Sequence, residues 1–121
     1  MIACHELSEM LSNFAESLRC LFGRHLKGVI LFGSYARGDF DEESDIDVLV
    51  LVDIDKGELY KYRTRISQIA EKCDWDCDNL ISPLLKNYEE YLEYQGVSGL
   101  YKTIMREGVP IYAEGLRQRS S

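Results

Sequence analysis

Residues 33–47 read GSYARGDFDEESDID and lie between two apolar runs of the chain. The run before them, VILF at 29–32, predicts a short buried strand, and the run after them, IDVLVLV at 46–52, predicts a second strand. Gly33 would let the backbone approach a ligand closely, and residues 35–37 can begin a helix whose free N–H groups favour an anion. The stretch therefore predicts a strand, a phosphate-binding turn and another strand.

Two carboxylates open the second predicted strand. Asp45 and Asp47 are two residues apart, so strand alternation puts both side chains on one face, with Cα atoms about 6.5–7 Å apart. Carboxylates at this spacing can share hard cations. Phosphate-binding backbone at Gly33 and Ser34, beside paired carboxylates, is what chemistry on a magnesium triphosphate requires. We therefore expect these residues to form one site.

Hydrophobic periodicity predicts the helices of the chain. Apolar residues at helical spacing indicate helices over about 5–24 and 56–73, and shorter helices follow over about 87–94 and 98–107. Asn87 and the glutamate three residues later resemble a capping box, which supports the third of these helices. Together with the strands, these helices predict a single α/β domain.

A third strand is predicted over 76–82, where Pro83 would stop it. The first two strands must run in opposite directions to bring the turn and the carboxylate pair to one site. The helix that follows them is about 25 Å long, enough to return the chain for a third strand parallel to the second. Asp76 and Asp78 then come close to the pair, and either could supply a third carboxylate.

The composition and charge of the chain argue against some classes of function. The 121 residues suit one domain, and no apolar run approaches the roughly 18 residues of a membrane span. A net charge of −7 argues against a nucleic-acid binder, and residues 39–55 carry eight acids and no base. Four cysteines without a basic leader are typical of cytoplasmic thiols. We expect a cytoplasmic protein that neither enters a membrane nor binds nucleic acid.

Other motifs fit the acidic stretch less well. A calcium loop would need glycine at Ser44 and a bidentate glutamate at Val50. A P-loop beginning at Gly33 would need Lys-Ser or Lys-Thr after Gly38, where the chain has Asp-Phe. Arg37 is compatible with two roles, contact with a phosphate or an ion pair with a nearby acid.

The Gly-Ser pair, followed after ten residues by Asp-x-Asp, resembles the signature of the polymerase β-like nucleotidyltransferases. The compact size resembles the minimal nucleotidyltransferases of bacteria and archaea. The resemblance spans roughly 5–113 and includes LISP at 80–83 and the ending YKTIMREGVPIY at 101–112. It implies the α/β (α+β) polymerase β-like nucleotidyltransferase fold, a small mixed sheet flanked by helices. We expect this domain over 1–113 and a flexible tail over 114–121.

The resemblance also implies roles for individual residues. The implied nucleotide-binding residues are Gly33, Ser34 and Arg37, and the implied catalytic and metal-binding residues are Asp45, Asp47 and Asp78. These three acids would hold two Mg²⁺ ions. The third acid is assigned to Asp78 because it directly precedes the sequence NLIS, and Asp76 is the alternative.

The function that the resemblance implies is transfer of NMP, above all AMP from ATP, to an acceptor hydroxyl with release of pyrophosphate. Family members of this size are often paired with a HEPN-domain protein in toxin–antitoxin modules, and some transfer AMP onto that partner. We therefore expect a magnesium-dependent protein adenylyltransferase that acts as an antitoxin. The alternatives are a non-catalytic antitoxin that binds nucleotide and toxin, and a nucleotidyltransferase that modifies a small molecule such as an antibiotic. The tyrosine-rich last third of the chain is the predicted docking surface for the partner.

Overall fold

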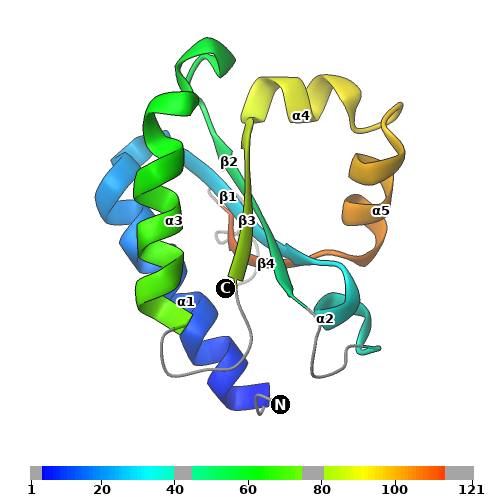
Figure 1. The fold of residues 1–121 in the computed structure, drawn as a ribbon. Coiled ribbons are helices and arrows are strands. Elements are labelled where there is room, and N and C mark those ends of the chain that lie inside the picture. The colour runs from blue at the N-terminus through cyan, green and yellow to red at the C-terminus, as the bar shows by residue number, and fades with distance from the viewer. Residues whose placement is uncertain (1–3, 40–44, 75–80, 114–121) are drawn as a thin grey trace.

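The computed structural model describes residues 4–39, 45–74 and 81–113, which form a mixed sheet with helices on both faces (Figure 1). The predicted tail at 114–121 lies outside these residues. The elements follow one another as α1 (Cys4–Phe22), η1 (Gly23–His25), β1 (Leu26–Phe32), α2 (Ser34–Arg37), β2 (Ile46–Val52), η2 (Lys56–Glu58), α3 (Tyr60–Asp74), β3 (Ile81–Asn87), α4 (Tyr88–Tyr94), α5 (Gly99–Glu107) and β4 (Val109–Ala113).

The sheet in this part of the chain has four strands in the order β3-β2-β1-β4. β1 pairs antiparallel with β2 and with β4, whereas β2 and β3 are parallel. The predicted directions of the first three strands are therefore confirmed. The register places Phe32 of β1 and Ser82 of β3 on either side of Asp47 in β2.

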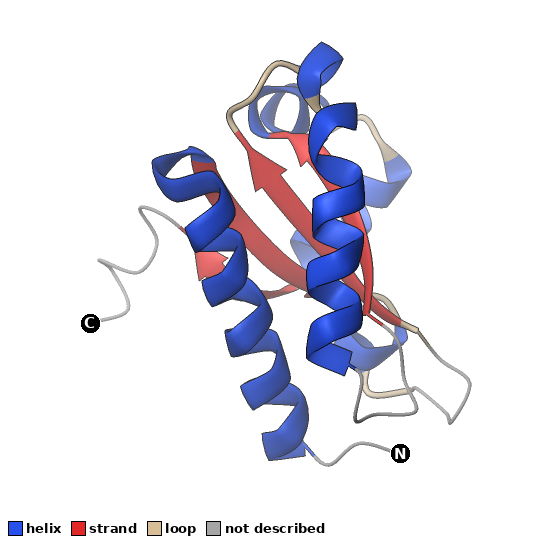
Figure 2. Ribbon diagram, turned by 60° about the vertical axis from the view of Figure 1, so that its left-hand side comes forward, coloured by secondary structure: helices blue, strands red, loops and turns tan. Residues whose placement is uncertain are grey.

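Strand β2 separates two hydrophobic cores because its side chains alternate between the faces of the sheet. Ile46, Val48, Val50 and Val52 pack with α1 and α3, the two long helices that lie together over one face in Figure 2. Leu49 and Leu51 pack on the other face with residues of α4 and α5. Among the helices of the described ranges, none is long and apolar enough to cross a membrane.

The two short C-terminal helices begin at side-chain caps. The Asn87 side chain accepts a hydrogen bond from the backbone N–H of Glu90 at 2.8 Å, and its amide nitrogen donates to the carbonyl of Ile54 at 2.7 Å. The Ser98 hydroxyl accepts from the N–H of Tyr101 at 3.3 Å. The cap predicted at Asn87 is therefore confirmed, and it also joins the end of β3 to the chain that leaves β2.

The prediction for the third strand is wrong in its bounds. β3 runs over Ile81–Asn87 and continues through Pro83, the predicted end of the strand. Proline lacks a backbone N–H and is tolerated in a strand at the edge of a sheet, and β3 is such a strand. The predicted portion at 76–80 lies outside the described residues.

Two further differences concern the other strands. β1 begins at Leu26, three residues before the predicted start. β4, at Val109–Ala113, was not predicted, because Pro110 directly after a helix suggested only a helix end. β4 occupies the other edge of the sheet, so Pro110 is tolerated there for the same reason as the proline of β3.

Only some of the tyrosines in the last third of the chain lie at the surface. Tyr91 and Tyr101 are buried in the second core, with ring centroids 5.0 Å apart in an edge-to-face arrangement. Tyr94, in contrast, is 45% exposed. A docking surface for a partner therefore cannot include all the tyrosines of this region, because burial of two of them stabilises the α4–α5 layer.

Gly108 fixes the passage from α5 to β4. A Cβ atom built at this position would collide with the carbonyl oxygen of Ile104 and would lie 2.7 Å from the Cγ2 atom of Ile30. The N–H of Gly108 donates to the same Ile104 carbonyl at 2.7 Å. Only glycine allows α5 to end this close to β1.

Gly108→Ala is expected to lower the free energy of unfolding by about 1–3 kcal/mol, because the added methyl group overpacks the contact with Ile30. Urea unfolding followed by circular dichroism measures the change. The matched control is Gly99→Ala at the start of the same helix, where a Cβ meets nothing within 4 Å and helix propensity favours alanine. A Gly108→Ala protein as stable as the wild type would contradict this account.

Candidate active site

The described part of the connection after β1 holds a short helix, α2, enclosed by two glycines with positive φ angles. Gly33 has φ 79° and Gly38 has φ 85°. The N–H groups of Ala36 and Arg37 both donate to the carbonyl of Gly33 at 3.1 Å, and Gly38 donates to Ser34 at 2.9 Å. These bonds form α2 as expected for residues 35–37. The side chain of Tyr35, buried in the first core, anchors α2 to the sheet.

Gly33 lies directly against Asp47. A Cβ atom at Gly33 would collide with Oδ2 of Asp47 and would lie 3.3 Å from its Cγ atom. The register pairs Phe32 with Asp47, so the end of β1 carries the turn to the start of β2. The sequence predicts that Gly33 lets the backbone approach a phosphate. In the structure, the φ of 79° at Gly33 favours glycine, and the Asp47 carboxylate occupies the space that a Cβ atom would take.

Asp45 and Asp47 interact electrostatically. Asp47 is half-buried on the face of β2 that also carries Leu49, and Asp45 is exposed just before the strand. Burial raises the pKa of Asp47 above its ordinary value, the charge of Asp45 raises it further, and the Arg37 guanidinium lowers it. The structure thus brings the two carboxylates and the arginine together beside Gly33. Ionised Asp47 is disfavoured here, and a proton or a cation relieves the cost.

Arg37 pairs with acids from two parts of the chain. Its Nε atom donates to Oδ2 of Asp39 at 3.2 Å, and its Nη1 atom lies 4.0 Å from Oε1 of Glu107 at the end of α5. Of the two roles left open by the sequence, the structure therefore shows the ion pair. The side chain is 43% exposed, so an incoming anion can reach it.

The third predicted carboxylate cannot be placed. Asp78 and the alternative, Asp76, lie outside the described residues. The residue that β3 sets beside Asp47 is Ser82. In the portions of the chain that the structure describes, no group of three His, Cys, Asp or Glu side chains is arranged to hold a metal ion. The metal roles of Asp45 and Asp47 consequently stay predictions.

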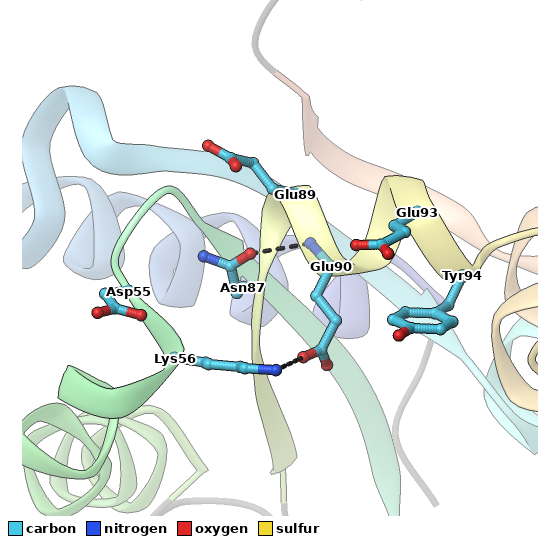
Figure 3. Close-up of a pocket in the computed structure, with 7 residues that line it drawn as sticks. All are labelled: Asp55, Lys56, Asn87, Glu89, Glu90, Glu93 and Tyr94. Atoms are coloured by element: carbon cyan, nitrogen blue, oxygen red, sulfur yellow. Dashed lines mark hydrogen bonds and ion pairs between the residues drawn. The ribbon is translucent and has the colours of Figure 1, made fainter.

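A cavity of about 530 Å³ lies elsewhere on the molecule, and Figure 3 shows its lining. It adjoins the far ends of β2 and β3, about 17 Å along β2 from Asp47. An ion pair of 3.3 Å joins Lys56 to Glu90 across it. Its lining residues are Asp55, Lys56, Asn87, Glu89, Glu90, Glu93 and Tyr94. Because most of these charges are negative, the cavity does not suit a triphosphate.

Glu107 is a site residue that sequence reasoning missed. It is 70 residues from Arg37 along the chain and comes to the turn only because α5 and β4 return to β1. Its side chain is 24% exposed. The sequence signal that could have located it is the glycine that follows it, which permits the close passage to β4.

Asp47→Asn is expected to raise the free energy of unfolding in metal-free buffer near neutral pH. The raised pKa means that the folded protein holds this proton more tightly than the unfolded chain does, so ionisation of Asp47 destabilises the fold as pH rises. The advantage of the variant should be absent below the ordinary pKa of 3.8, should grow as pH rises through the raised pKa, and should then stay constant. Urea unfolding across this pH range measures it.

Asp53→Asn serves as a control, because that carboxylate lies 2.6 Å from His25 and 3.7 Å from Lys27 and its loss should not stabilise the protein. An Asp47→Asn protein less stable than the wild type at neutral pH would show that the carboxylate is held by favourable contacts instead of being strained by burial and repulsion.

Comparison with known proteins places this chain in a family. A family model described as "Nucleotidyltransferase domain" matches residues 11–108. A Methanocaldococcus jannaschii protein named "Putative protein adenylyltransferase" is 42% identical over 80 residues, which cover 66% of this chain and 79% of that protein. A second protein of that organism with the same type of name is 49% identical over 45 residues, 37% of this chain and 45% of that protein.

Solved structures share the fold. The crystal structure of a Sulfolobus solfataricus protein described as a "putative nucleotidyltransferase" superposes with a TM-score of 0.60 at 19% identity, over 88% of this chain and 79% of that chain. A toxin–antitoxin crystal structure with AMP-PNP superposes with a TM-score of 0.52 at 19% identity, over 89% and 77%. The mixed sheet flanked by helices and the family resemblance are thus confirmed, and the chain belongs to the nucleotidyltransferase domain family.

Proposed function

We propose that this protein transfers AMP from ATP to a hydroxyl group of a partner protein and acts as the antitoxin of that partner. The observation that carries the proposal is the Asp45–Asp47 pair held against the Gly33 turn in a chain of the nucleotidyltransferase family. The names of the M. jannaschii relatives, which describe protein adenylyltransferases, support the reaction. The toxin–antitoxin structure with AMP-PNP, which has this fold, supports the biological role.

The turn supplies the nucleotide-binding residues in this proposal. Gly33 and Ser34 contact the triphosphate at the start of α2, because the N-terminus of a helix favours an anion. Arg37 exchanges its pair with Asp39 for a phosphate oxygen, and charge-assisted hydrogen bonds of a guanidinium to phosphate are strong and directional. The acidic surroundings repel a bare triphosphate, so we expect ATP to bind together with metal.

The carboxylates fit magnesium. Asp45 and Asp47 offer oxygen donors, the ligands that Mg²⁺ prefers, and their repulsion is relieved by a divalent cation. Asp78 is the proposed third ligand, which would complete a site for two ions. Bound magnesium neutralises charge on the α-phosphate and on the leaving pyrophosphate and activates the acceptor oxygen.

The proposed reaction makes one bond and breaks one. The acceptor oxygen bonds to the α-phosphorus of ATP, and the bond from that phosphorus to the oxygen that bridges to the β-phosphate breaks. Pyrophosphate leaves with the bridging oxygen. The acceptor proton passes to the carboxylate of Asp78, which serves as the general base in this proposal.

A protein is favoured as the acceptor over a nucleic acid. The chain carries a net charge of −7, whereas affinity for a polyanion comes mainly from Lys and Arg at its phosphates. The family resemblance points to a HEPN-domain toxin as that protein. ATP is found in the cytoplasm, and the four cysteines of the chain are expected to be reduced thiols, which are also typical of the cytoplasm. We therefore place the reaction there.

Magnesium is expected to stabilise the protein through the carboxylate pair. A ligand present at a hundredfold excess over its Kd adds about 2.7 kcal/mol to the free energy of unfolding, so Mg²⁺ or Mn²⁺ should raise the melting temperature. Asp45→Asn and Asp47→Asn should each remove this rise. Asp55→Asn, in the distant cavity, should keep it. An equal rise in the wild type and in both site variants would contradict the metal assignment.

The partner is expected to gain the mass of AMP. Co-expression with the HEPN-domain protein, followed by mass spectrometry of the intact partner, should show added AMP units on its hydroxyl side chains. The units should be absent when the Asp45→Asn protein is co-expressed, because metal binding is lost.

The same experiment separates the alternatives. If the Asp45→Asn protein still neutralises an unmodified partner, the protein is a binding antitoxin without catalysis. If the partner is unmodified while a small molecule such as an antibiotic receives the nucleotide, the acceptor class is wrong although the transfer chemistry is correct.

A further inference from the structure

Glu107 lies at the candidate active site, although it is not part of the sequence motif at residues 33–47. It is the last residue of α5, and Figure 1 shows α5 ending near α2. Its carboxylate faces the Nη1 side of Arg37, whereas Asp39 binds the Nε side. The guanidinium thus has acids on two of its sides, one from its own turn and one from a distant element.

The position of Glu107 is set by packing and not by the ion pair. Ile104, one turn earlier in α5, is 2% exposed in the second core. Gly108, the next residue, lies so close to Ile30 that no side chain fits between them. Val109 then pairs with Leu31 of β1. The backbone on both sides of Glu107 is therefore held to β1, the strand that leads into the Gly33 turn.

Arg37 in turn acts on the carboxylate pair. Its positive charge opposes the effects of burial and of Asp45 on the pKa of Asp47. The guanidinium therefore interacts electrostatically both with Asp47 and with the end of α5. A flexible side chain in this position would lose rotamer freedom when a phosphate binds, and this loss weakens binding. An acid that already orients the side chain removes part of the loss.

We propose that Glu107 is a positioning residue that holds the Arg37 guanidinium toward the triphosphate of the bound nucleotide. The proposal rests on the function proposed above and adds a residue to its nucleotide-binding site. Glu107 itself touches no nucleotide in this account and acts only through Arg37. The contact is long and partly exposed, so its effect on binding is modest.

Glu107→Gln tests the proposal, since glutamine keeps the size of the side chain and removes its charge. Calorimetric titration with Mg²⁺-ATP should give a Kd about two- to fivefold higher than that of the wild type. Glu93→Gln, an exposed acid of the distant cavity, should leave the Kd unchanged. An unchanged urea midpoint for Glu107→Gln would show that the effect does not come from unfolding.

A double-mutant cycle separates positioning from a purely structural role. If Glu107 acts through Arg37, Glu107→Gln should change the Kd less than about 1.5-fold in an Arg37→Gln background, because the pair is already lost. An equal effect of Glu107→Gln in both backgrounds would overturn the proposal. Tighter binding of Mg²⁺-ATP by Glu107→Gln would also overturn it, because this result would indicate that the Glu107 carboxylate simply repels the phosphate. Wild-type protein that binds no Mg²⁺-ATP would overturn the proposed function as well, whereas normal wild-type binding with no effect of Glu107→Gln would overturn only this proposal.

Discussion

The contact between the Asp47 carboxylate and the backbone of Gly33 is the constraint on which the candidate active site depends. It exists because β1 and β2 pair with Phe32 opposite Asp47, so the turn after β1 must pass the carboxylate. Any side chain at Gly33 would collide with that carboxylate. A half-buried carboxylate with a raised pKa is thereby kept beside a second acid and an arginine, where a divalent cation would stabilise it.

Packing on both faces of the sheet holds this site in place. On one face, Ile46, Val48 and their neighbours pack with α1 and α3 and fix β2 in the centre of the domain. On the other face, the α4–α5 layer packs on Leu49 and Leu51, directly beyond Asp47 on the same strand. The end of α5 then reaches the turn at Glu107. The site therefore depends on both cores, although its chemistry comes from one short stretch of sequence.

Much of this arrangement could be predicted from local sequence. The strand at 46–52 has β-branched alternation between acids, and its predicted bounds match β2. The antiparallel direction of β1 followed from the need to bring Gly33 and Asp45 together. The bounds of β3 could not be predicted, because Pro83 is acceptable only in a strand already known to be at an edge. Glu107 was beyond prediction because its place depends on the pairing of β4 with β1, a contact between distant segments.

We expect metal-bound nucleotide to occupy the end of the sheet at Gly33, Asp45 and Asp47, and not the cavity lined by Lys56 and Glu89 at the opposite end. Paramagnetic broadening of backbone amide signals by Mn²⁺-ATP tests it most directly. We expect signals of Gly33, Ser34 and Asp47 to broaden at low metal concentration while those of Lys56 and Glu89 stay sharp. Broadening centred on Lys56 and Glu89, with the Gly33 turn unaffected, would contradict the account.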